Sequence, residues 1–386
     1  MKEVEFLIAG GGGAGLALTS ALLDSPLGDR SILIVDRDAK QQNDRTWCFW
    51  GGVETPFASL ACHSWPKIAV RSEDFERVFD LEDNWRYWMV RGIDYYDWMR
   101  AKTDAKPNVV WTRGSVDGIR EEGGRALVSI DGEPVSARWV FNSILHPGEL
   151  KPDPRKHFFL MQHFKGWEIQ TVQPVFDPAC ATFHDFRTPQ EGDLRFLYIL
   201  PFTPTRALVE YTIFSSRLLA PEEYEHGLTE YIHTQLGLER YEILSEENGS
   251  IPMTDYPFTR RGGERVLNIG TKGGLVKPST GFAFQRMQAD ARAIVASLLR
   301  NGHPFHLPRP PARFRFYDSL LLQMLYRQGS RMKSIFVRLF DRNPIRRILR
   351  FLGENSTPFE DLALIATLPP GPFLQALWRI KLLRRI

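Results

Sequence analysis

The chain has 386 residues, of which 43% are hydrophobic and 25% are charged. This length and composition suffice for two domain-sized cores and exclude a disordered chain. The formal net charge is only +3, and the basic excess lies in residues 342–386, so no nucleic-acid-binding domain is expected. Cys48, Cys62 and Cys180 are too few and too scattered for a disulfide framework or a metal site, which fits a reducing, cytoplasmic compartment.

The first forty residues predict a strand, a glycine-rich turn, a helix and a second strand that ends in an acid. Gly10, Gly12 and Gly15 follow an apolar run with the G-x-G-x-x-G spacing. In dinucleotide-binding folds these glycines permit the tight turn, the approach of the backbone to the pyrophosphate, and close packing of helix on strand. Asp36 ends the second strand, where its carboxylate can accept the hydroxyls of an adenosine ribose. An ordinary glycine turn is the alternative.

The next segment is expected to extend the sheet that begins at Val4. A polar and aromatic loop is predicted at 43–47, and a helix at 94–102. Predicted turns lie at 121–124 and 131–132. Short strands are predicted at 67–70, 76–81, 109–112, 126–130 and 138–142.

A second, β-rich layer is predicted from residue 158 onwards. Its clearest strands are 195–200 and 207–214, which join across 201–205, and a helix is predicted at 222–236. This layer would hold the substrate above the cofactor.

A second cofactor clamp is predicted after the β-rich layer. A strand ends at Gly270, a loop contains Gly273 and Gly274, and a helix is expected to begin near Gly281. Such a clamp suits a flavin better than a nicotinamide, because a flavin needs contacts at its ring system as well as at its pyrophosphate. An ordinary strand, loop and helix is the alternative.

Several segments, in the right order over most of the chain, resemble motifs of the lycopene cyclases of carotenoid synthesis, in particular the bacterial β-type. Besides the glycine turn they are Asp44-Arg45-Thr46-Trp47, His163-Phe164-Lys165-Gly166-Trp167, Asp185-Phe186-Arg187, Leu208-Val209-Glu210-Tyr211-Thr212, Ile251-Pro252-Met253 and 269–284. Plant relatives carry two adjacent acids where this chain has Glu210 and Tyr211. The role of a paired second carboxylate is therefore open here.

The resemblance implies an isomerase (intramolecular lyase) that cyclises the acyclic ψ-end groups of lycopene or a related carotenoid to β-rings. It further implies reduced FAD as a cofactor that is not consumed, NAD(P)H as its electron donor, and contacts with other carotenoid enzymes. The residues that it places at the cofactor are Gly10, Gly12, Gly15, Asp36, Arg45, Gly270, Gly273, Gly274 and Gly281.

Two acids are the candidates for catalysis. The reaction needs a carboxylic acid that is protonated near neutral pH, an electron-rich surface beside the cation, and exclusion of water. Glu210 lies in an apolar strand, where burial would raise its pKa, and the resemblance selects it. A solvent-facing glutamate, or one paired with Arg206, is the alternative. Asp185 is the second candidate, and a structural ion pair with Arg187 is its alternative.

The C-terminus is expected to lie on a membrane surface, because a forty-carbon hydrocarbon must be drawn from a bilayer. Apolar and basic residues alternate at helical spacing in 345–352, and 373–386 combines Trp378 with four basic residues. Prolines in 369–372 prevent the uncharged run 362–378 from spanning a bilayer. An amphipathic helix that packs on the protein is the alternative.

The predicted fold class is α/β, with a Rossmann-type FAD-binding domain, a β-rich substrate domain as in flavoprotein hydroxylases and reductases, and a helical, membrane-facing C-terminal region. The FAD-binding parts are expected at 1–70, 95–150 and 260–300, the substrate parts at 71–94 and 151–259, and the helical region at 301–386. An FAD-dependent oxidoreductase, either an aromatic hydroxylase or a prenyl-chain reductase, is the alternative function. A non-catalytic membrane-bound carotenoid carrier is a third.

Overall fold

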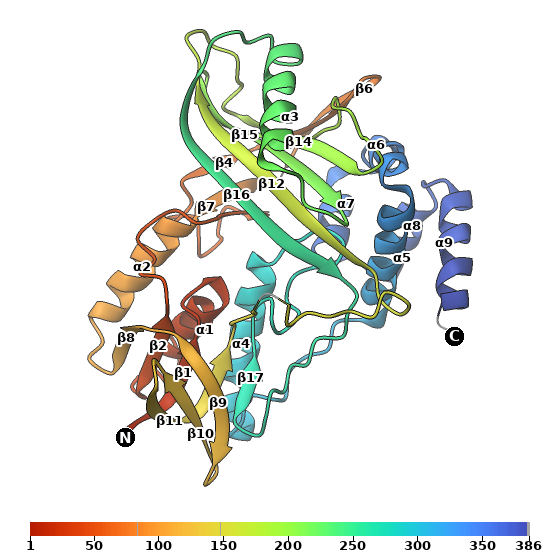
Figure 1. Cartoon of the computed structure of the whole chain (residues 1–386). Coiled ribbons are helices and arrows are strands. Elements are labelled where there is room, and N and C mark those ends of the chain that lie inside the picture. The colour runs from red at the N-terminus through yellow and green to blue at the C-terminus, as the bar shows by residue number, and fades with distance from the viewer. Residues whose placement is uncertain (83, 147, 384–386) are drawn as a thin grey trace.

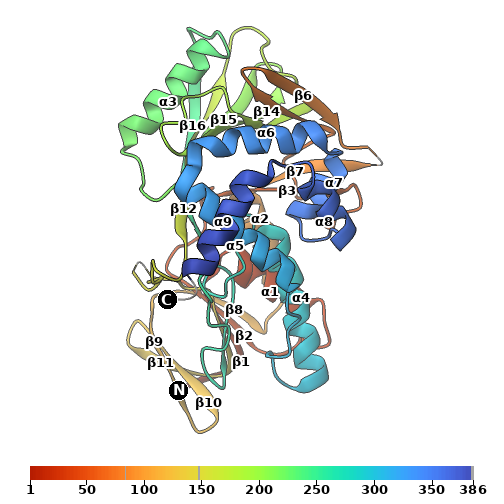
Figure 2. The ribbon, with the colours of Figure 1, turned by 90° about the vertical axis from the view of Figure 1, so that its right-hand side faces the viewer.

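Two seven-stranded sheets and a layer of C-terminal helices make up the structure (Figure 1). The computed structural model describes residues 1–82, 84–146 and 148–383, except for the side chains of 381–383. The first sheet lies at the bottom of Figure 1 and the second above it. Figure 2 shows α5, α6 and α9 running along one side of the molecule.

The first sheet is built around β1 (Lys2–Ala9), whose apolar residues are buried on both faces. It is parallel to both of its neighbours, β2 and β11. The order β8-β2-β1-β11-β10-β9 is joined by β17, which pairs with β11. Besides β1 its strands are β2 (Ile32–Asp36), β8 (Val109–Arg113), β9 (Val116–Glu122), β10 (Arg125–Ile130), β11 (Glu133–Asn142) and β17 (Val266–Asn268).

Helices α1 (Gly13–Leu23), α2 (Gly92–Asp104) and α4 (Phe284–Asn301) accompany the first sheet. Small residues at the start of α1 let it lie close to β1: a Cβ added at Gly15 would come within 2.0 Å of the carbonyl oxygen of Gly10. The helix N-terminus is thereby held at the carboxyl end of β1, where α/β sheets bind their ligands.

The second sheet has the order β16-β12-β15-β14-β13-β5-β6 and is antiparallel except between β13 and β5. One face packs on α3 (Pro221–Thr234), and the other faces an apolar core that it shares with the C-terminal helices. Its strands are β5 (Lys67–Ser72), β6 (Phe75–Asp80), β12 (Phe159–Gln170), β13 (Cys180–Asp185), β14 (Leu194–Thr203), β15 (Arg206–Ser215) and β16 (Glu242–Thr254).

A small third sheet connects the two large ones. It has the order β3-β7-β4, with β3 (Thr46–Gly52), β7 (Trp85–Arg91) and β4 (His63–Trp65). Trp65 donates its indole hydrogen to the carbonyl oxygen of Pro201 on β14 at 2.8 Å, while α4 packs on β3. The three sheets thus meet at one place in the described structure, and the functional cavity lies there.

The C-terminal helices pack mainly on the second sheet. They are α5 (Ala312–Gln328), the short 3₁₀ turn η1 (Gly329–Arg331), α6 (Met332–Arg342), α7 (Ile345–Leu352), α8 (Pro358–Ile365) and α9 (Pro370–Leu383). In α7, Ile345, Ile348 and Leu349 are all less than 8% exposed. The amphipathic segment 345–352 therefore uses its apolar face inside the protein, so the packed-helix alternative holds there. No helix in the described part of the chain is long and apolar enough to cross a membrane.

Most expected elements form, but the strands predicted at 67–70 and 76–81 do not extend the first sheet: they are β5 and β6 of the second sheet, where β5 pairs with β13. The other differences are local. The fold class is confirmed, and every strand of the first sheet falls within the segments expected to bind FAD. The turn predicted at 121–124 is shorter, because β9 continues to Glu122, and the loop predicted at 43–47 gives way to β3 at Thr46. Helix α4 begins at Phe284, three residues after the expected Gly281.

A buried ion network ties the loop between β17 and α4 to the C-terminal helices. Lys277 donates to Asp318 on α5 at 2.8 Å and to Glu354 after α7 at 2.9 Å, and Arg286 on α4 contacts Glu354 at 2.7 Å. Burial alone would raise the pKa of Glu354, but the charges of Lys277 and Arg286 outweigh it and lower that pKa. Removing one partner from such a network leaves a buried charge without compensation.

We therefore expect Lys277→Met to destabilise the protein by about 3–5 kcal/mol, because Asp318 would stay buried without its cation and Glu354 would keep only Arg286. The measurement is urea unfolding followed by far-UV circular dichroism. Lys333→Met is the control, since Lys333 pairs with the largely exposed Glu73 and should cost less than about 1 kcal/mol. Equal losses in the two variants would contradict the structural role given to Lys277.

Candidate active site

One large cavity of about 610 Å³ runs from the glycine turn of the first sheet to the inner face of the second sheet. Gly10, Gly12 and Asp36 line its first end, and Glu210 and Glu247 line its second end. Strands of all three sheets and the start of α4 contribute to its wall. The cavity therefore joins a nucleotide-type cradle to a pair of acids.

The glycine turn has the geometry that a pyrophosphate requires. Gly10 has a φ of +104° and Gly12 has no atom within 4 Å of an added Cβ, so the backbone there is open to a ligand. Gly15 does not line the cavity; it lets α1 pack against β1. Asp36 accepts hydrogen bonds from the backbone nitrogens of Gly11 at 2.7 Å and Asp38 at 2.9 Å. A carboxylate has further lone pairs, so Asp36 can still accept ribose hydroxyls.

The second clamp is divided between lining and shaping residues. Gly270 and Gly281 line the cavity, with φ values of +60° and +73°. Gly273 and Gly274 do not line it: a Cβ at Gly273 would meet the carbonyl oxygen of Asn268 at 2.5 Å, and Gly274 has a φ of +74°. These two glycines instead permit the tight turn that places the loop, so only part of the predicted clamp faces a ligand directly.

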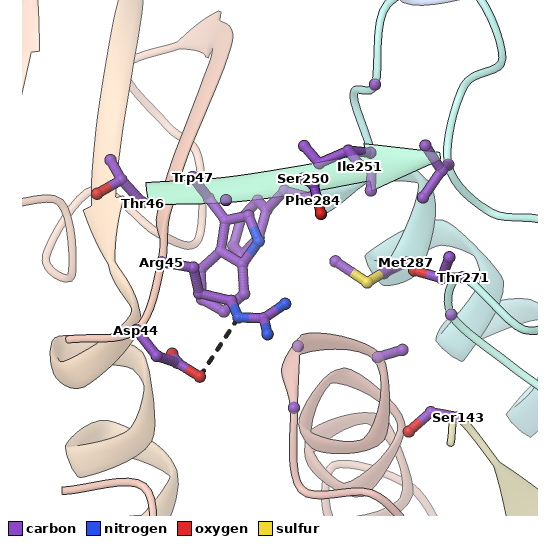
Figure 3. Close-up of a pocket in the computed structure, with 18 of the residues that line it drawn as sticks. Asp44, Arg45, Thr46, Trp47, Ser143, Ser250, Ile251, Thr271, Phe284 and Met287 are labelled. Atoms are coloured by element: carbon purple, nitrogen blue, oxygen red, sulfur yellow. Dashed lines mark ion pairs between the residues drawn. The ribbon is translucent and has the colours of Figure 1, made fainter. Parts of the chain in front are cut away.

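The segment that begins β3 closes the cavity above the start of α1 (Figure 3). Arg45 pairs with Asp44 at 3.5 Å, and Figure 3 shows this pair beside Trp47 and Phe284. The rings of Trp47 and Phe284 lie 5.4 Å apart, and a Cβ on Gly13 would meet Trp47 at 2.9 Å. A guanidinium and aromatic rings at a helix N-terminus suit a ligand with both phosphate and ring portions.

Two buried polar atoms on the cavity wall also fit such a ligand. The side-chain oxygens Oε1 of Gln162 and Oγ1 of Thr280 have no hydrogen-bond partner among the described residues, and both residues line the cavity. Buried polar atoms normally have partners. A cofactor whose ring offers donors and acceptors would satisfy them.

Glu210 lies on the face of β15 that looks toward the cavity and the apolar core. Its Oε1 accepts a hydrogen bond from the Thr212 hydroxyl at 2.7 Å, and no ion pair reaches it from the described residues. Arg206 pairs with Glu168 instead, so the Arg206 alternative for Glu210 does not hold. Burial, and then the charge of Glu247, hold the pKa of Glu210 well above its ordinary value, although the Thr212 hydrogen bond lowers it. Burial and the neighbouring acid therefore both favour the neutral form of Glu210.

Glu247 on β16 is a second acid that sequence reasoning missed. Glu210 and Glu247 both pair with Gly166 on the strand between them, so their side chains flank the same glycine. A Cβ on Gly166 would lie 3.2 Å from Cγ of Glu247 and 3.4 Å from Cβ of Glu210. The only sequence signal was a pair of acids in a strand-like segment, and the register of two strand pairs brings Glu247 to the site.

The groups around the two acids are themselves uncharged. Cys48 on β3, Tyr87 on β7 and Tyr198 on β14 all line this end of the cavity. Burial is the main reason that the pKa of each lies well above its ordinary value. The acids thus face neutral, partly aromatic walls, which strengthens electrostatic effects between charges placed there.

Asp185 does not line the cavity. It is fully buried, contacts the Arg187 guanidinium at 2.6 Å and accepts a hydrogen bond from the Tyr231 hydroxyl at 2.5 Å. The Arg187 pKa lies above its ordinary value, chiefly because of the hydrogen bond with Asp185. The structure therefore joins Asp185 to α3 and does not bring it beside Glu210, so we retain it only as a residue that shapes the substrate domain.

The raised pKa of Glu210 makes stability depend on pH. An unfolded glutamate titrates at about 4.3. Above that pH folding requires Glu210 to take up a proton, so the stability present at lower pH is lost as pH rises through the folded pKa. We expect Glu210→Gln to raise the melting temperature at pH 8 relative to the wild type and to leave it nearly unchanged at pH 4. Differential scanning calorimetry at both pH values measures this. Glu246→Gln, on an exposed ion pair with Lys165, should show no such pH-dependent gain.

The architecture around this cavity recurs in solved flavoproteins. A flavoprotein/dehydrogenase from Cytophaga hutchinsonii superposes with a TM-score of 0.63 at 13% identity, covering 100% of this chain and 99% of that chain. A geranylgeranyl bacteriochlorophyll reductase-like protein from Thermoplasma acidophilum gives a TM-score of 0.61 at 13% identity, with 98% and 100% covered. The chain therefore has the fold of the FAD-dependent flavoproteins.

Sequence comparison specifies the family within this fold. The family model described as "Lycopene cyclase protein" matches residues 5–378. A lycopene beta-cyclase from Pantoea ananas is 26% identical over 407 residues, covering 95% of this chain and 96% of that protein. The chain belongs to the lycopene cyclase family, as its motifs suggested.

Proposed function

We propose that this protein cyclises the acyclic ψ-end groups of lycopene to β-rings, and that Glu210 is the acid that starts the reaction. The observation that carries the proposal is the position of Glu210: a half-buried carboxylic acid with a raised pKa at the inner end of a cavity whose outer end is a dinucleotide cradle. An acid that must protonate a carbon–carbon double bond has to be neutral and shielded from water. The raised pKa of Glu210 and the partly aromatic walls at this end of the cavity support the proposal.

The residues of the site suggest how the reaction would run. Glu210 would deliver its proton to the terminal double bond, and an internal double bond would attack the resulting tertiary cation to close the ring. Tyr87 and Tyr198 present aromatic surface at this end of the cavity, and a cation is attracted by such ring faces. Loss of a different proton would then complete an isomerisation in which no atoms are gained.

The cofactor we propose is FAD, held by the glycine turn, Asp36, Arg45 and the second clamp. In its reduced form, FAD would supply an electron-rich surface that stabilises the cation without being consumed. The main-chain nitrogens at the start of α1 would bind its pyrophosphate, and Asp36 would hold its ribose. NAD(P)H is the electron donor that we propose for its reduction.

The experiment that tests this function uses purified protein, lycopene in liposomes and reduced FAD under anaerobic conditions. We expect a product with the mass of lycopene and a shorter-wavelength absorption, because each ring twists a double bond out of conjugation. Glu210→Gln should lose a factor of roughly a hundred or more in kcat while it still binds FAD, which is the usual contribution of a general acid.

A product that has lost a pair of hydrogens or gained an oxygen atom would assign the protein to the flavin oxidoreductases instead. Consumption of one reducing equivalent pair per ring would do the same. Binding of lycopene without any turnover would favour the carrier alternative. Full activity of Glu210→Gln would remove Glu210 from the acid role.

We further propose that α8 and α9 contact a membrane surface from which the substrate is drawn. Large apolar side chains are exposed on both: Phe359 is 84% and Leu362 62% exposed on α8, and Leu374 is 62% and Trp378 66% exposed on α9. Aromatic and aliphatic side chains of this kind insert at the boundary between headgroups and acyl chains. Of the four basic residues expected to assist them in 373–386, Arg379 is half-buried, and Lys381, Arg384 and Arg385 lie outside the residues whose side chains the structure describes.

The double variant Phe359→Ala/Trp378→Ala should weaken liposome binding about tenfold or more, because burial of each side chain in the membrane would contribute about 1.5–3 kcal/mol of binding free energy. Sedimentation with liposomes of anionic and of neutral lipid measures this, with FAD content as the check on folding. Val172→Ala is the matched control, since Val172 is 88% exposed outside the C-terminal helices. Unchanged sedimentation of the double variant would contradict the proposed contact.

A further inference from the structure

We propose that Glu247 is a second catalytic residue, which accepts the proton that leaves the newly formed ring and returns it to Glu210. This inference rests on the proposed cyclisation. It assigns a base to a reaction for which the family motifs had indicated only an acid. The proton would leave and re-enter through two carboxyl groups of the same cavity, and water would not be required.

The geometry of the sheet places the two acids together. Because β12 lies between β15 and β16, residues that pair with the same position of β12 project from the same face. That position is Gly166, the partner of both Glu210 and Glu247. An added Cβ there would come within 3.2 Å of Cγ of Glu247. The missing side chain leaves the space in which the two carboxyl groups meet.

The hydrogen bonds give the two acids different roles. Thr46 donates to Oε2 of Glu247 at 2.6 Å. Oε1 of Glu247 is buried and receives no hydrogen bond from any group with a fixed proton in the described structure. Each acid accepts one threonine hydroxyl, Glu210 that of Thr212 and Glu247 that of Thr46. Burial raises the pKa of both acids, and it holds the pKa of Glu210 the further above its ordinary value. Two adjacent carboxylates cannot both carry charge cheaply, so the pair shares one proton, and the stronger rise in the pKa of Glu210 favours that proton on Glu210.

Each bond change in the proposed cycle is balanced. The O–H bond of Glu210 breaks and a C–H bond forms at the terminal double bond, which leaves a tertiary cation. The internal double bond forms the ring and moves the cation, and a neighbouring C–H bond breaks to give the ring double bond. That proton forms an O–H bond on Glu247. Transfer of this proton to Glu210 restores the starting state, with no oxidant, reductant or other reactant needed.

Other charged and titratable groups near the pair do not compete for the role. Cys48, Tyr87 and Tyr198 keep their protons, since burial raises the pKa of each, so none of them is free to act as the base. Glu168 on β12 pairs with Arg206. Glu246, adjacent to Glu247, pairs with Lys165 at 3.2 Å and is half exposed.

The test compares Glu247→Gln with the wild type in the liposome assay with reduced FAD. We expect kcat to fall by a factor of roughly a hundred or more, with FAD content retained. The decline of the residual activity at high pH should begin at least about one pH unit lower than in the wild type, because the charge that holds the proton on Glu210 is gone. Glu246→Gln is the matched control and should keep the wild-type rate and pH profile.

A Glu247→Gln variant with the wild-type rate, or with a reduced rate and an unchanged pH profile, would overturn the proposal. If the wild type itself does not cyclise lycopene, the proposed function fails as a whole; if the wild type is active and Glu247→Gln is equally active, only the role of Glu247 fails.

A second pair of variants covers the case in which Glu247→Gln does not fold. Thr46→Val removes the hydroxyl that stabilises ionised Glu247, whereas Thr46→Ser retains it. We expect Thr46→Val to shift the low-pH decline of activity to higher pH, since Glu247 would then become protonated earlier, and Thr46→Ser to restore the wild-type profile. Identical profiles for wild type and Thr46→Val would overturn the proposal.

Discussion

The arrangement depends on one electrostatic constraint: a carboxyl group must remain protonated near neutral pH inside a cavity that also admits a charged cofactor. Burial on an inner sheet face provides the desolvation, and a second carboxyl group across a single glycine provides the negative charge. The neutral walls of Cys48, Tyr87 and Tyr198 keep the dielectric constant low around them. The third sheet supplies two of these walls as well as the Thr46 hydroxyl, so it belongs to the chemistry as much as to the cofactor cradle.

The same constraint relates a fold found among flavin-dependent enzymes to the cyclisation that we propose. The fold provides a cofactor cradle at the carboxyl ends of parallel strands and a second sheet above it, and neither feature determines the reaction. What differs is the residue that the second sheet presents to the ring portion of the cavity. Here it presents two acids, Glu210 and Glu247, on either side of Gly166.

Sequence reasoning located what depends on local spacing and missed what depends on register. Gly10, Gly12 and Asp36 could be placed because a strand, a turn and a helix define their positions within a few residues of one another. Glu210 could be selected from its apolar strand together with the family motif. Glu247 could not, because its place beside Glu210 depends on how β16 and β15 each align with β12. A slip of one residue would have turned it to the opposite face.

The amphipathic pattern at 345–352 shows the opposite error, since an alternation of apolar and basic residues has the same appearance whether its apolar side meets lipid or protein. The burial of Ile348 and Leu349 decides the matter for α7, and no periodicity in the sequence could have done so. On α8 and α9, by contrast, the exposed apolar residues are single large side chains with weak periodicity. A search for amphipathic helices therefore does not find them.

The ion network at Lys277 has a thermodynamic consequence for the whole molecule. Gly281 lies in the same loop and lines the cofactor cavity, while Asp318 and Glu354 belong to the helical region that carries α8 and α9. Order in the loop and order in the helices are therefore linked, and linkage is reciprocal. A ligand that orders the loop at the cavity would also order the terminal helices. Cofactor binding and membrane binding would then strengthen each other.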